Sequence, residues 1–386
     1  MTTPAAASAA PAAPLTTRAR VLLVTFALLA IQLAWIAVPA YACGCGAMVP
    51  HTGQQVVVND ETSAVRWDGH REDIVMRLRV SGDVRDVAWV MPVPHRAQVR
   101  LGESELFTQL ETATAPERRT RHYFWPRDGD WPFGGDDSGD AAAPKPGAPR
   151  SDVNVVGREH LGPFDVARLT ATDPDALADW LQRNGFTLPS RLAKALQPYV
   201  DQGWEYVAIR LAPEDRGSVL GGALDPLHLT FAGDRLVYPM RLSQLAHTPQ
   251  NLTLYVLAAH RMETRSAIGG ERPEVTYAGK VTAPAAGPLA QLAAGTPYLT
   301  TLRQAFPTPS RIDADHELRR AAADTPYRTV HYTDRLLTVG PGIPVWFLTL
   351  VAAVTVTGTA ALLTVRTRRR RPVLPPPPVH VPPPLG

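Results

Sequence analysis

The feature that most constrains this chain is an uncharged apolar run near its C-terminal end. Pro344–Val365 contains 22 residues without a charge, and a helix of that length reaches ~33 Å, enough to cross the hydrocarbon core of a membrane. Trp346 lies at its start, where an indole suits the membrane interface. Arg366 and Arg368–Arg371 follow directly, and basic flanks stay in the cytoplasm. The sequence therefore predicts a transmembrane helix at 344–365.

A second apolar run lies near the N-terminal end. Val21–Val38 is uncharged, follows Arg18 and Arg20, and precedes Ala40-Tyr41-Ala42. A basic flank, an apolar stretch and an A-x-A site together describe a secretory signal peptide. We predict that residues 1–42 are a signal peptide; an uncleaved anchor is the alternative, because the run sits at the lower length limit for a span. Residues 43–343 then face outward from a single-pass cell-membrane protein whose C-terminus is cytoplasmic.

The net charge of +3 is misleading, because seven arginines lie in the flanks of the two apolar runs. Without these seven, the 39 basic residues become 32 against 36 acidic ones, so the outward region carries about −4. A nucleic-acid-binding domain should show a basic footprint. The composition therefore argues against a nucleic-acid partner.

The outward region alternates between strand and helix patterns. Apolar–polar alternation predicts strands, while Asp173-Pro174 and Gly185 begin and end one helix of a predicted helical pair. The expected class is α+β: a mostly antiparallel β ectodomain with a helical pair and one C-terminal transmembrane helix. The predicted strands are Ser63–Trp67, Asp73–Val80, Val84–Met91, Trp204–Leu211, Leu227–Phe231, Arg235–Leu242, Leu252–Ala259 and Glu274–Val281, and the predicted helices are Ser104–Thr112, Ala176–Arg183, Pro189–Val200 and Asp313–Ala323.

Two Gly-Asp pairs suggest an internal echo. Gly82-Asp83 and Gly233-Asp234 each follow an alternating strand, and the next strand meets Pro92 or Pro239. We interpret both as hairpin turns, with the second strand ended by proline, in two related β-units. The predicted divisions are 1–42 signal peptide, 43–125 first β-rich part, 126–150 flexible Gly/Asp/Pro insertion, 151–283 helical pair then strands, 284–343 partly ordered membrane-proximal segment, 344–365 transmembrane helix and 366–386 basic, Pro-rich tail.

The two cysteines lie just after the predicted signal peptide. Cys43 and Cys45 are separated by Gly44 alone, and the oxidising exterior permits a local disulfide bridge. We favour such a bridge, which would pin a short N-terminal hook near Pro92–Pro94. A redox-active pair, a metal or cofactor site completed by histidine, and lipidation of Cys43 are the alternatives.

Aromatic residues surround the predicted insertion. We favour a strand that enters the core for Trp125, Trp131 and Phe133, and contact with a ligand or a membrane surface is the alternative. The Pro-rich tail favours a disordered spacer over a docking site for a cytoplasmic partner. No G-x-S-x-G, H-E-x-x-H or Walker motif occurs. We therefore assign no catalytic residue, metal ligand or cofactor.

Several short motifs recur together in a known bacterial family. They are Cys-Gly-Cys-Gly at 43–46, Ala88–Pro94, Leu181–Phe186 with Tyr199 and Gly203, Tyr206–Leu211, Pro226–Leu229 and Val237–Leu242. In this order they resemble the family called domain of unknown function 2330, over about residues 43–310. The resemblance implies a secreted or membrane-tethered protein and brings no activity with it.

These observations favour a non-enzymatic surface protein over an enzyme. We expect it to bind an envelope protein or polymer, or to organise the envelope. A thiol–disulfide or cofactor-dependent enzyme centred on Cys43 and Cys45, and an accessory subunit of a membrane complex, are the alternatives.

The cysteine pair yields a stability prediction. Because the loop closed by a Cys43–Cys45 bridge is so short, Cys43→Ser with Cys45→Ser should cost on the order of 1 kcal/mol or less. Thermal unfolding of the purified ectodomain with and without the double substitution measures this cost. A loss of several kcal/mol would instead indicate a metal or a long-range contact.

Overall fold

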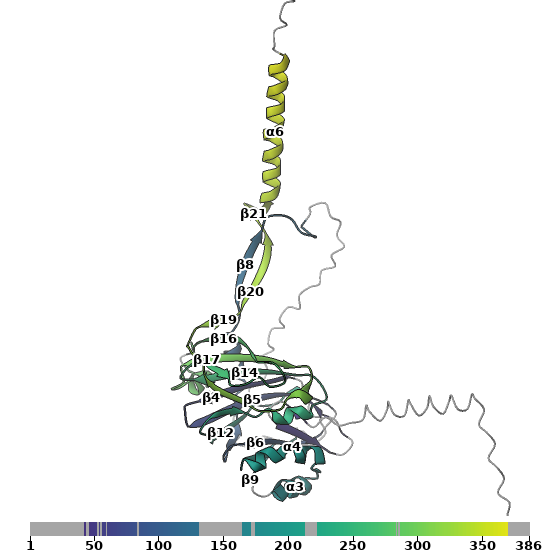
Figure 1. Cartoon of the computed structure of the whole chain (residues 1–386), viewed down its shortest axis with the longest axis vertical. Coiled ribbons are helices and arrows are strands. Elements are labelled where there is room, and N and C mark those ends of the chain that lie inside the picture. The colour runs from purple at the N-terminus through teal and green to yellow at the C-terminus, as the bar shows by residue number, and fades with distance from the viewer. Residues whose placement is uncertain are drawn as a thin grey trace, which may run out of the picture. The chain divides into compact units, whose positions relative to one another are not determined.

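The computed structural model describes residues 42–43, 46–51, 54, 56–58, 60–82, 85–130, 164–170, 174–212, 222–282, 284 and 286–369. These residues divide into two compact units, the first within Met1–Pro116 and Gly157–Thr329 and the second within Glu117–Val156 and Val330–Gly386. The sheets are mostly antiparallel and the helices few. This confirms the predicted α+β class (Figure 1).

The first unit is built on a ten-stranded sheet, the large sheet. Its strand order is β19-β16-β17-β14-β4-β5-β12-β7, with β3 and β11 pairing to β5. Neighbours are antiparallel except β4 and β14. The strands are β3 (Val56–Val57), β4 (Asp60–Trp67), β5 (Arg71–Gly82), β7 (Gln98–Leu101), β11 (Gly222–Ala223), β12 (Leu227–Ala232), β14 (Gln250–Ala258), β16 (Glu274–Lys280), β17 (Tyr298–Phe306) and β19 (Tyr327–Arg328).

A five-stranded antiparallel sheet, the small sheet, packs on the large one. Its order is β1-β2-β6-β10-β9, and its strands are β1 (Ala42–Cys43), β2 (Gly46–Pro50), β6 (Val87–Val93), β9 (Phe164–Thr170) and β10 (Glu205–Leu211). Every residue of β6 is buried. Because successive side chains of a strand point to opposite faces, both faces of this sheet must be covered.

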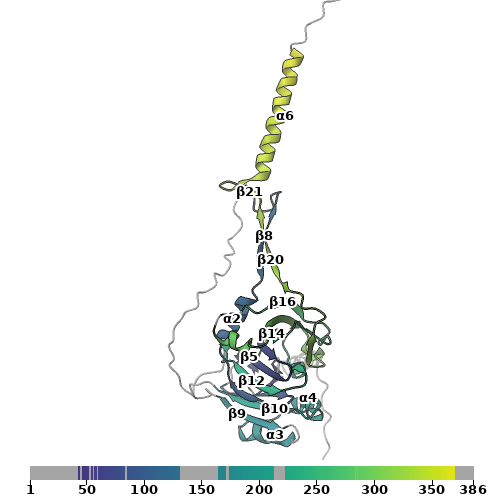
Figure 2. The ribbon, with the colours of Figure 1, turned by 90° about the vertical axis from the view of Figure 1, so that its left-hand side faces the viewer.

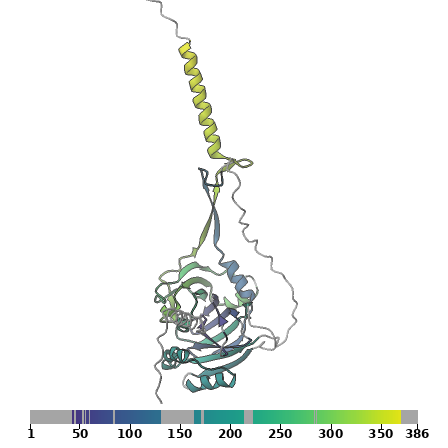
Figure 3. The same ribbon diagram turned by 90° about the vertical axis from the view of Figure 1, so that its right-hand side faces the viewer.

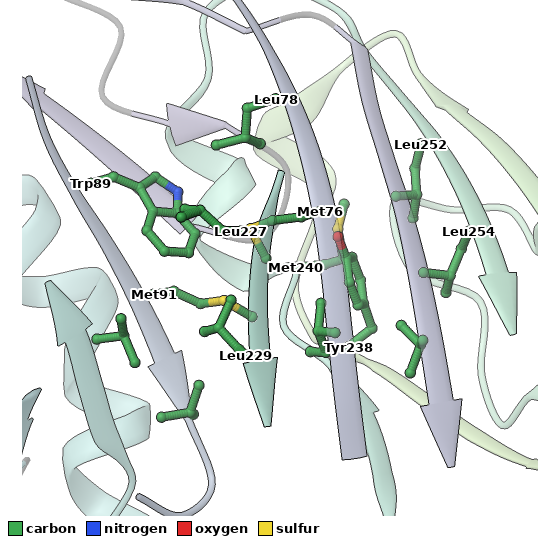
Figure 4. Close-up of a cluster of buried hydrophobic side chains, with 14 of the residues drawn as sticks. Met76, Leu78, Trp89, Met91, Leu227, Leu229, Tyr238, Met240, Leu252 and Leu254 are labelled. Atoms are coloured by element: carbon green, nitrogen blue, oxygen red, sulfur yellow. The ribbon is translucent and has the colours of Figure 1, made fainter. Parts of the chain in front are cut away.

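One face of the small sheet meets the large sheet in the main core. Trp89 and Met91 of β6 belong to the same buried cluster as Met76 of β5 and Leu229 of β12 (Figure 4). Tyr238, which is also fully buried, belongs to this cluster. The two sheets therefore form a sandwich whose core is supplied by alternate residues of each strand.

The opposite face of the small sheet is covered by two helices. Those helices, α3 (Pro174–Arg183) and α4 (Ser190–Asp201), are drawn beside β6 and β9 in Figure 1. Ala88 and Val90 share a buried cluster with Leu181 and Tyr199 of the helices. The helices end where the sequence predicted, because Gly185 and Gly203 both have positive φ (82° and 71°), a conformation that glycine adopts without a Cβ penalty.

The outer face of the large sheet is covered by α2 (Glu105–Ala113) and the short α5 (Pro288–Leu292). Phe107 and Leu110 of α2 and Leu289 of α5 form a third buried cluster with Val75 and Tyr255 of the sheet. Helix α2 matches the predicted helix at 104–112 to within a residue. Figure 2 shows α2 beside the strands of the large sheet.

Residues 284–343 contain more regular structure than the sequence suggested. Strand β17 is a long inner strand of the large sheet, paired with β14 and β16. A three-stranded sheet follows, with order β13-β18-β15. The predicted helix at Asp313–Ala323 is wrong: His316–Arg320 is β18, and buried His316 and Leu318 alternate with half-buried Glu317. Asp315 precedes this strand and accepts hydrogen bonds from the Tyr199 hydroxyl (2.7 Å) and the Met240 backbone N–H (2.8 Å). The remaining elements here are β13 (Leu236–Tyr238), η1 (Arg241–Leu245), β15 (Met262–Thr264) and η2 (Pro309–Arg311).

The two predicted Gly-Asp hairpins are also wrong. After β5 the chain leaves the large sheet for β6 of the small sheet, and after β12 it leaves for β13 of the three-stranded sheet. Strands β5 and β12 instead pair with each other, Met76 opposite Leu227. Each Gly-Asp pair thus marks a crossing between sheets, which needs the same turn residues as a hairpin.

The sequence suggested that Pro92 ends the third predicted strand, Val84–Met91, but it does not. Strand β6 continues to Val93, and Pro92 lies opposite Tyr206 of β10. The pairing of β6 with β2 covers only Val87–Val90. Proline cannot donate a hydrogen bond, and it is tolerated here because β6 is an edge on that side by this point.

The second unit contains a two-stranded ribbon and the C-terminal helix. Strands β8 (Glu117–Tyr123) and β20 (Val330–Leu336) pair in parallel, and a small hairpin of β21 (Thr338–Val339) and β22 (Ile343–Pro344) leads into α6 (Val345–Arg369). Helix α6 has a mean hydropathy of 2.0 and is long and apolar enough to span a membrane (Figure 3). This agrees with the predicted span at 344–365.

Glu72 gives the first core a pH dependence. Its side chain is fully buried, accepts one hydrogen bond from the Val237 backbone N–H (3.3 Å) and leaves Oε1 without a partner. Burial, with the nearby charge of Asp73, raises its pKa well above the ordinary value. The folded state therefore holds a proton that the unfolded state loses above about pH 4.3, so this group lowers stability as pH rises above that value.

We expect Glu72→Gln to remove that loss. The melting temperature of the variant should exceed that of the wild type by more at about pH 8 than at about pH 5. The buried acid of the wild type loses stability as the pH rises, and the neutral amide of the variant does not. Thermal unfolding in mild detergent measures the difference, with exposed Glu274→Gln as the matched control. An equal shift at both pH values would contradict the burial argument.

Candidate functional site

A polar pocket opens on the outer face of the large sheet, in the first unit. Its volume is about 170 Å³, and strands β4, β5, β7 and β12 supply its floor while α2 and α5 supply its walls. The lining residues are Arg66, Asp73, Val75, Arg100, Leu101, Gly102, Glu103, Leu106, His228, Pro288, Gln291 and Leu292. The lining of the pocket thus combines charged side chains with apolar side chains of the two helices.

Strand register brings the charged residues together. Arg66 lies opposite Asp73 in the β4–β5 pair, and Thr230 lies opposite Asp73 in the β5–β12 pair. His228 stands two residues earlier on β12, directly opposite Arg100 of β7. Side chains opposite one another or two apart on adjacent strands share a face. The arrangement is therefore a product of sheet pairing among four strands, of which β12 is distant in sequence from the other three.

Asp73 is the centre of this group. Its Oδ1 accepts hydrogen bonds from His228 Nε2 (2.9 Å) and Thr230 Oγ1 (2.7 Å), and its Oδ2 accepts one from Arg66 Nη1 (3.2 Å). Burial alone would raise the pKa of Asp73, but the hydrogen bonds from His228 and Thr230 and the attraction of His228 lower it to about 2. Asp73 is thus a carboxylate at neutral pH and can only accept hydrogen bonds.

The carboxylate fixes the imidazole of His228. Because Asp73 accepts, His228 Nε2 must carry the proton that it donates, and Nδ1 is the ring nitrogen that remains for a second contact. His228 is 7% exposed and lines the pocket. Nδ1 has no hydrogen-bond partner among the described residues. The pocket therefore contains an oriented imidazole with one nitrogen available to a ligand.

The two arginines of the pocket differ in their partners. Arg66 bonds Asp68 and Asp73 and also donates to the Ala294 carbonyl oxygen (3.3 Å). Arg100 is exposed and forms no ion pair with any described residue. Arg66 therefore stabilises the structure of the site, whereas the exposed guanidinium of Arg100 can bind a solute.

The ionisable groups of the pocket are carboxylates, arginines and one histidine, and none of its described lining residues is a serine, cysteine or lysine. An oriented histidine beside a cation, with apolar walls formed by Leu106 and Leu292, is suited to hold a small polar molecule.

A second cluster of side chains holds the N-terminal hook, the short segment that contains β2. His51 Nε2 pairs with Asp86 Oδ1 (2.8 Å), its Nδ1 lies 3.0 Å from the Gly185 carbonyl oxygen, and its ring stacks on Phe186 at 4.4 Å. Arg210 Nη2 binds the other oxygen of Asp86 (2.8 Å). These contacts connect the end of β2, the turn between α3 and α4, and β10. The sequence motifs at these places therefore belong to one hydrogen-bonded cluster.

The predicted cysteine site is only partly described. Cys43 lies in β1 opposite Gly46, its side chain is not among those described, and Cys45 lies outside the described residues. The bridge stays a prediction. The hook itself runs along β6, with Ala47 opposite Val90, and a Cβ at Gly46 would lie 2.7 Å from both Trp89 Nε1 and the Val90 carbonyl oxygen. Glycine is therefore required where the hook meets the core.

Of the predicted aromatic contacts, only Trp125 is described. It is 69% exposed and lies in the second unit, while Trp131 and Phe133 lie outside the described residues. The strand before it, β8, is largely exposed, and for Trp131 and Phe133 both the ligand contact and the core strand stay predictions.

The pocket was missed by sequence reasoning. Arg66 and Asp73 are opposite each other across the predicted turn at Asp68-Gly69, and His228 is part of the Pro226–Leu229 motif. Nothing in the sequence indicates that β5 and β12 pair. Without that pairing, Asp73 and His228 are two separate polar residues in apolar strands.

Asp73 should make the site sensitive to acid. Its folded pKa is about 2 and its ordinary value is 3.8, so its stabilising contribution of roughly 2 kcal/mol is present above pH 4 and is lost as pH falls through 4 to 2. Asp73→Asn should abolish that part of the pH dependence. Thermal unfolding across this pH range tests it, with exposed Asp234→Asn as the control; an unchanged acid limb in Asp73→Asn would contradict the assignment.

Comparison with curated proteins finds no match. Among solved structures, baculovirus P35 aligns over 72% of this chain and 97% of its own, at 11% identity and a TM-score of 0.29. The caspase-8/P35 complex aligns over 69% of this chain and 94% of its own, at 7% identity and a TM-score of 0.27. These scores do not establish a common fold.

The family match is of a different kind. The family DUF2330, described as an uncharacterized protein conserved in bacteria, matches residues 39–319. That range includes the hook, the whole pocket and every strand of the two sandwich sheets except β19, and it confirms the resemblance carried by the short motifs. The chain belongs to the DUF2330 family.

Proposed function

We propose that this protein is exported, held in the membrane by α6, and acts by binding a small anionic molecule in the pocket of the first unit. The observation that carries the proposal is Arg100, a cation that has no ion-pair partner among the described residues and lies opposite the oriented imidazole of His228. Carboxylates and phosphates are the ligand class that a guanidinium recognises through two parallel N–H donors.

The topology is supported by the ends of α6. The helix is uncharged from Val345 to Val365, and basic residues occupy its last turn. Basic flanks stay in the cytoplasm, and this places residues 43–343 outside in the proposal. An extracytoplasmic ligand is then a solute or a polymer end of the cell envelope.

The pocket has the size and polarity of a site for a small molecule. Its volume of about 170 Å³ is close to the ~150 Å³ of a cavity that holds benzene. Asp73 and Arg66 neutralise each other at the base. Arg100 at the rim can then balance the charge of an anion, and His228 Nδ1 can accept a hydrogen bond from its hydroxyl or protonated carboxyl group.

The carboxylate of Glu103 narrows the choice of ligand. It lines the same pocket and repels a second negative charge. We therefore expect a singly charged carboxylate that also carries a donor group, such as a hydroxy acid or an amino acid, to bind better than inorganic phosphate.

The test is ligand-dependent stability of the full-length protein in detergent. Lactate, alanine, acetate and inorganic phosphate are titrated, and a ligand at ten times its Kd should stabilise the protein by about 1.4 kcal/mol. Arg100→Gln should weaken binding at least about tenfold, since a charged hydrogen bond is lost. Arg96→Gln, an exposed arginine on the preceding loop, is the matched control. The absence of stabilisation by all four anions, or an equal loss in Arg96→Gln, would exclude this function.

A further inference from the structure

The start of α6 and the end of the ribbon share one hydrogen-bonded junction. Leu337 donates its backbone N–H to the Tyr123 carbonyl oxygen (2.8 Å), and its own carbonyl accepts from Val345 N–H (2.9 Å). Strand β8, strand β20 and the first residue of α6 therefore meet within the second unit (Figure 2). The residues next to this junction and the first turn of α6 are neighbours, so they share the same surroundings.

Apolar side chains are exposed around the junction. Trp125, on the loop after β8, is 69% exposed and packs edge-to-face with Phe124 at 5.1 Å. Val339 and Ile343, which face each other across the β21–β22 hairpin, are 47% and 42% exposed. The hairpin turn contains Gly340 and Gly342, both with positive φ, so its shape is set by residues that tolerate that conformation.

The remainder of the ribbon is polar. Arg121 and Arg127 both pair with Asp334 (2.8 and 2.7 Å), and Arg119 pairs with Glu117 (2.9 Å). His331 is exposed at the end of the ribbon remote from α6. Tyr332 of β20 is also exposed (57%), with the Arg121 guanidinium 5.7 Å from the centre of its ring. The exposed large aliphatic side chains of the described ribbon and hairpin, Val339 and Ile343, lie at the end from which α6 begins.

We propose that this end, which we call the junction face and define as Trp125, Val339 and Ile343, lies in the headgroup layer of the bilayer that α6 spans. The proposal rests on the membrane insertion of α6. Tryptophan is enriched at that depth because its ring is amphipathic, and the two aliphatic side chains gain from leaving water. The face is continuous with the exposed apolar surface of α6, where Phe347 is 45% exposed, and lipid is the one occupant that covers both.

Quenching by brominated lipids tests the proposal. The full-length protein is reconstituted in bilayers brominated near the headgroup, and the quenching of wild type and Trp125→Phe is compared. The quenched emission should fall measurably in Trp125→Phe, because Trp125 is in reach of the bromine. Trp204→Phe, which removes a buried indole, is the matched control and should change nothing.

New tryptophans in the Trp125→Phe background extend the test. Val339→Trp should restore headgroup-level quenching, whereas His331→Trp, on the remote end of the ribbon, should not. Val354→Trp, halfway along α6, reports insertion separately through lipids brominated deep in their chains.

The outcomes separate the two claims. If Val354→Trp is not quenched, α6 is not inserted and both the membrane topology and the junction face are wrong. If Val354→Trp is quenched while Trp125 and Val339→Trp are not, the topology stands and the junction face is covered by something else, such as a second copy. Equal quenching of His331→Trp and Val339→Trp would also overturn the proposal, since contact would not be confined to the junction.

Discussion

The burial of β6 on both faces is the constraint on which the first unit depends. Its odd-numbered residues, among them Trp89 and Met91, fill the main core, and Ala88 and Val90 lie under α3 and α4. Small residues on one face let the helices approach closely, while large ones on the other fill the space between two sheets about 10 Å apart. The hook must lie along this strand as well, and Gly46 is the residue that fits against Trp89.

Local structure could be predicted from the sequence, and long-range pairing could not. Strands β4 and β5 follow from alternation around Asp68-Gly69, and the ends of α3 and α4 follow from Gly185 and Gly203. The crossing at Gly82-Asp83 has the residues of a hairpin, because turn chemistry does not depend on which sheet receives the next strand. The segment at 313–323 was mistaken for a helix because its charges occur at helical spacing, although buried His316 and Leu318 have strand spacing.

The same limit explains the pocket. Its acid, Asp73, and its imidazole, His228, are 155 residues apart in sequence and meet because β5 and β12 are neighbours. Sequence patterns report periodicity within an element, and only the topology of the sheet says which elements are adjacent. The cysteine pair, by contrast, can be recognised from the sequence, because only Gly44 separates Cys43 from Cys45.

Buried polar groups in the first unit fall into two kinds. Asp73 has hydrogen-bonding partners for both oxygens, and in this state its charge is stabilised. Glu72 and His316 are buried with polar atoms that have no partner among the described residues; burial lowers the pKa of His316 to about 4 and raises the pKa of Glu72 well above its ordinary value, and both shifts favour the neutral form. A buried charge is stable only where partners surround it, as they surround Asp73 in the pocket.

The ribbon of the second unit has a different physical basis from the sandwich. Six of the seven residues of β8 are exposed, so the ribbon has no core of its own, and isolated two-stranded pairs are marginal in water. Its surface ion pairs, such as Arg121–Asp334, add at most about 1 kcal/mol each. The ribbon is held instead at its ends: one end continues the folded chain at Pro116 and Thr329, and the other is bonded to α6 through Leu337. In the proposal above, a bilayer around Trp125 and Ile343 would give the ribbon a second anchor at its α6 end.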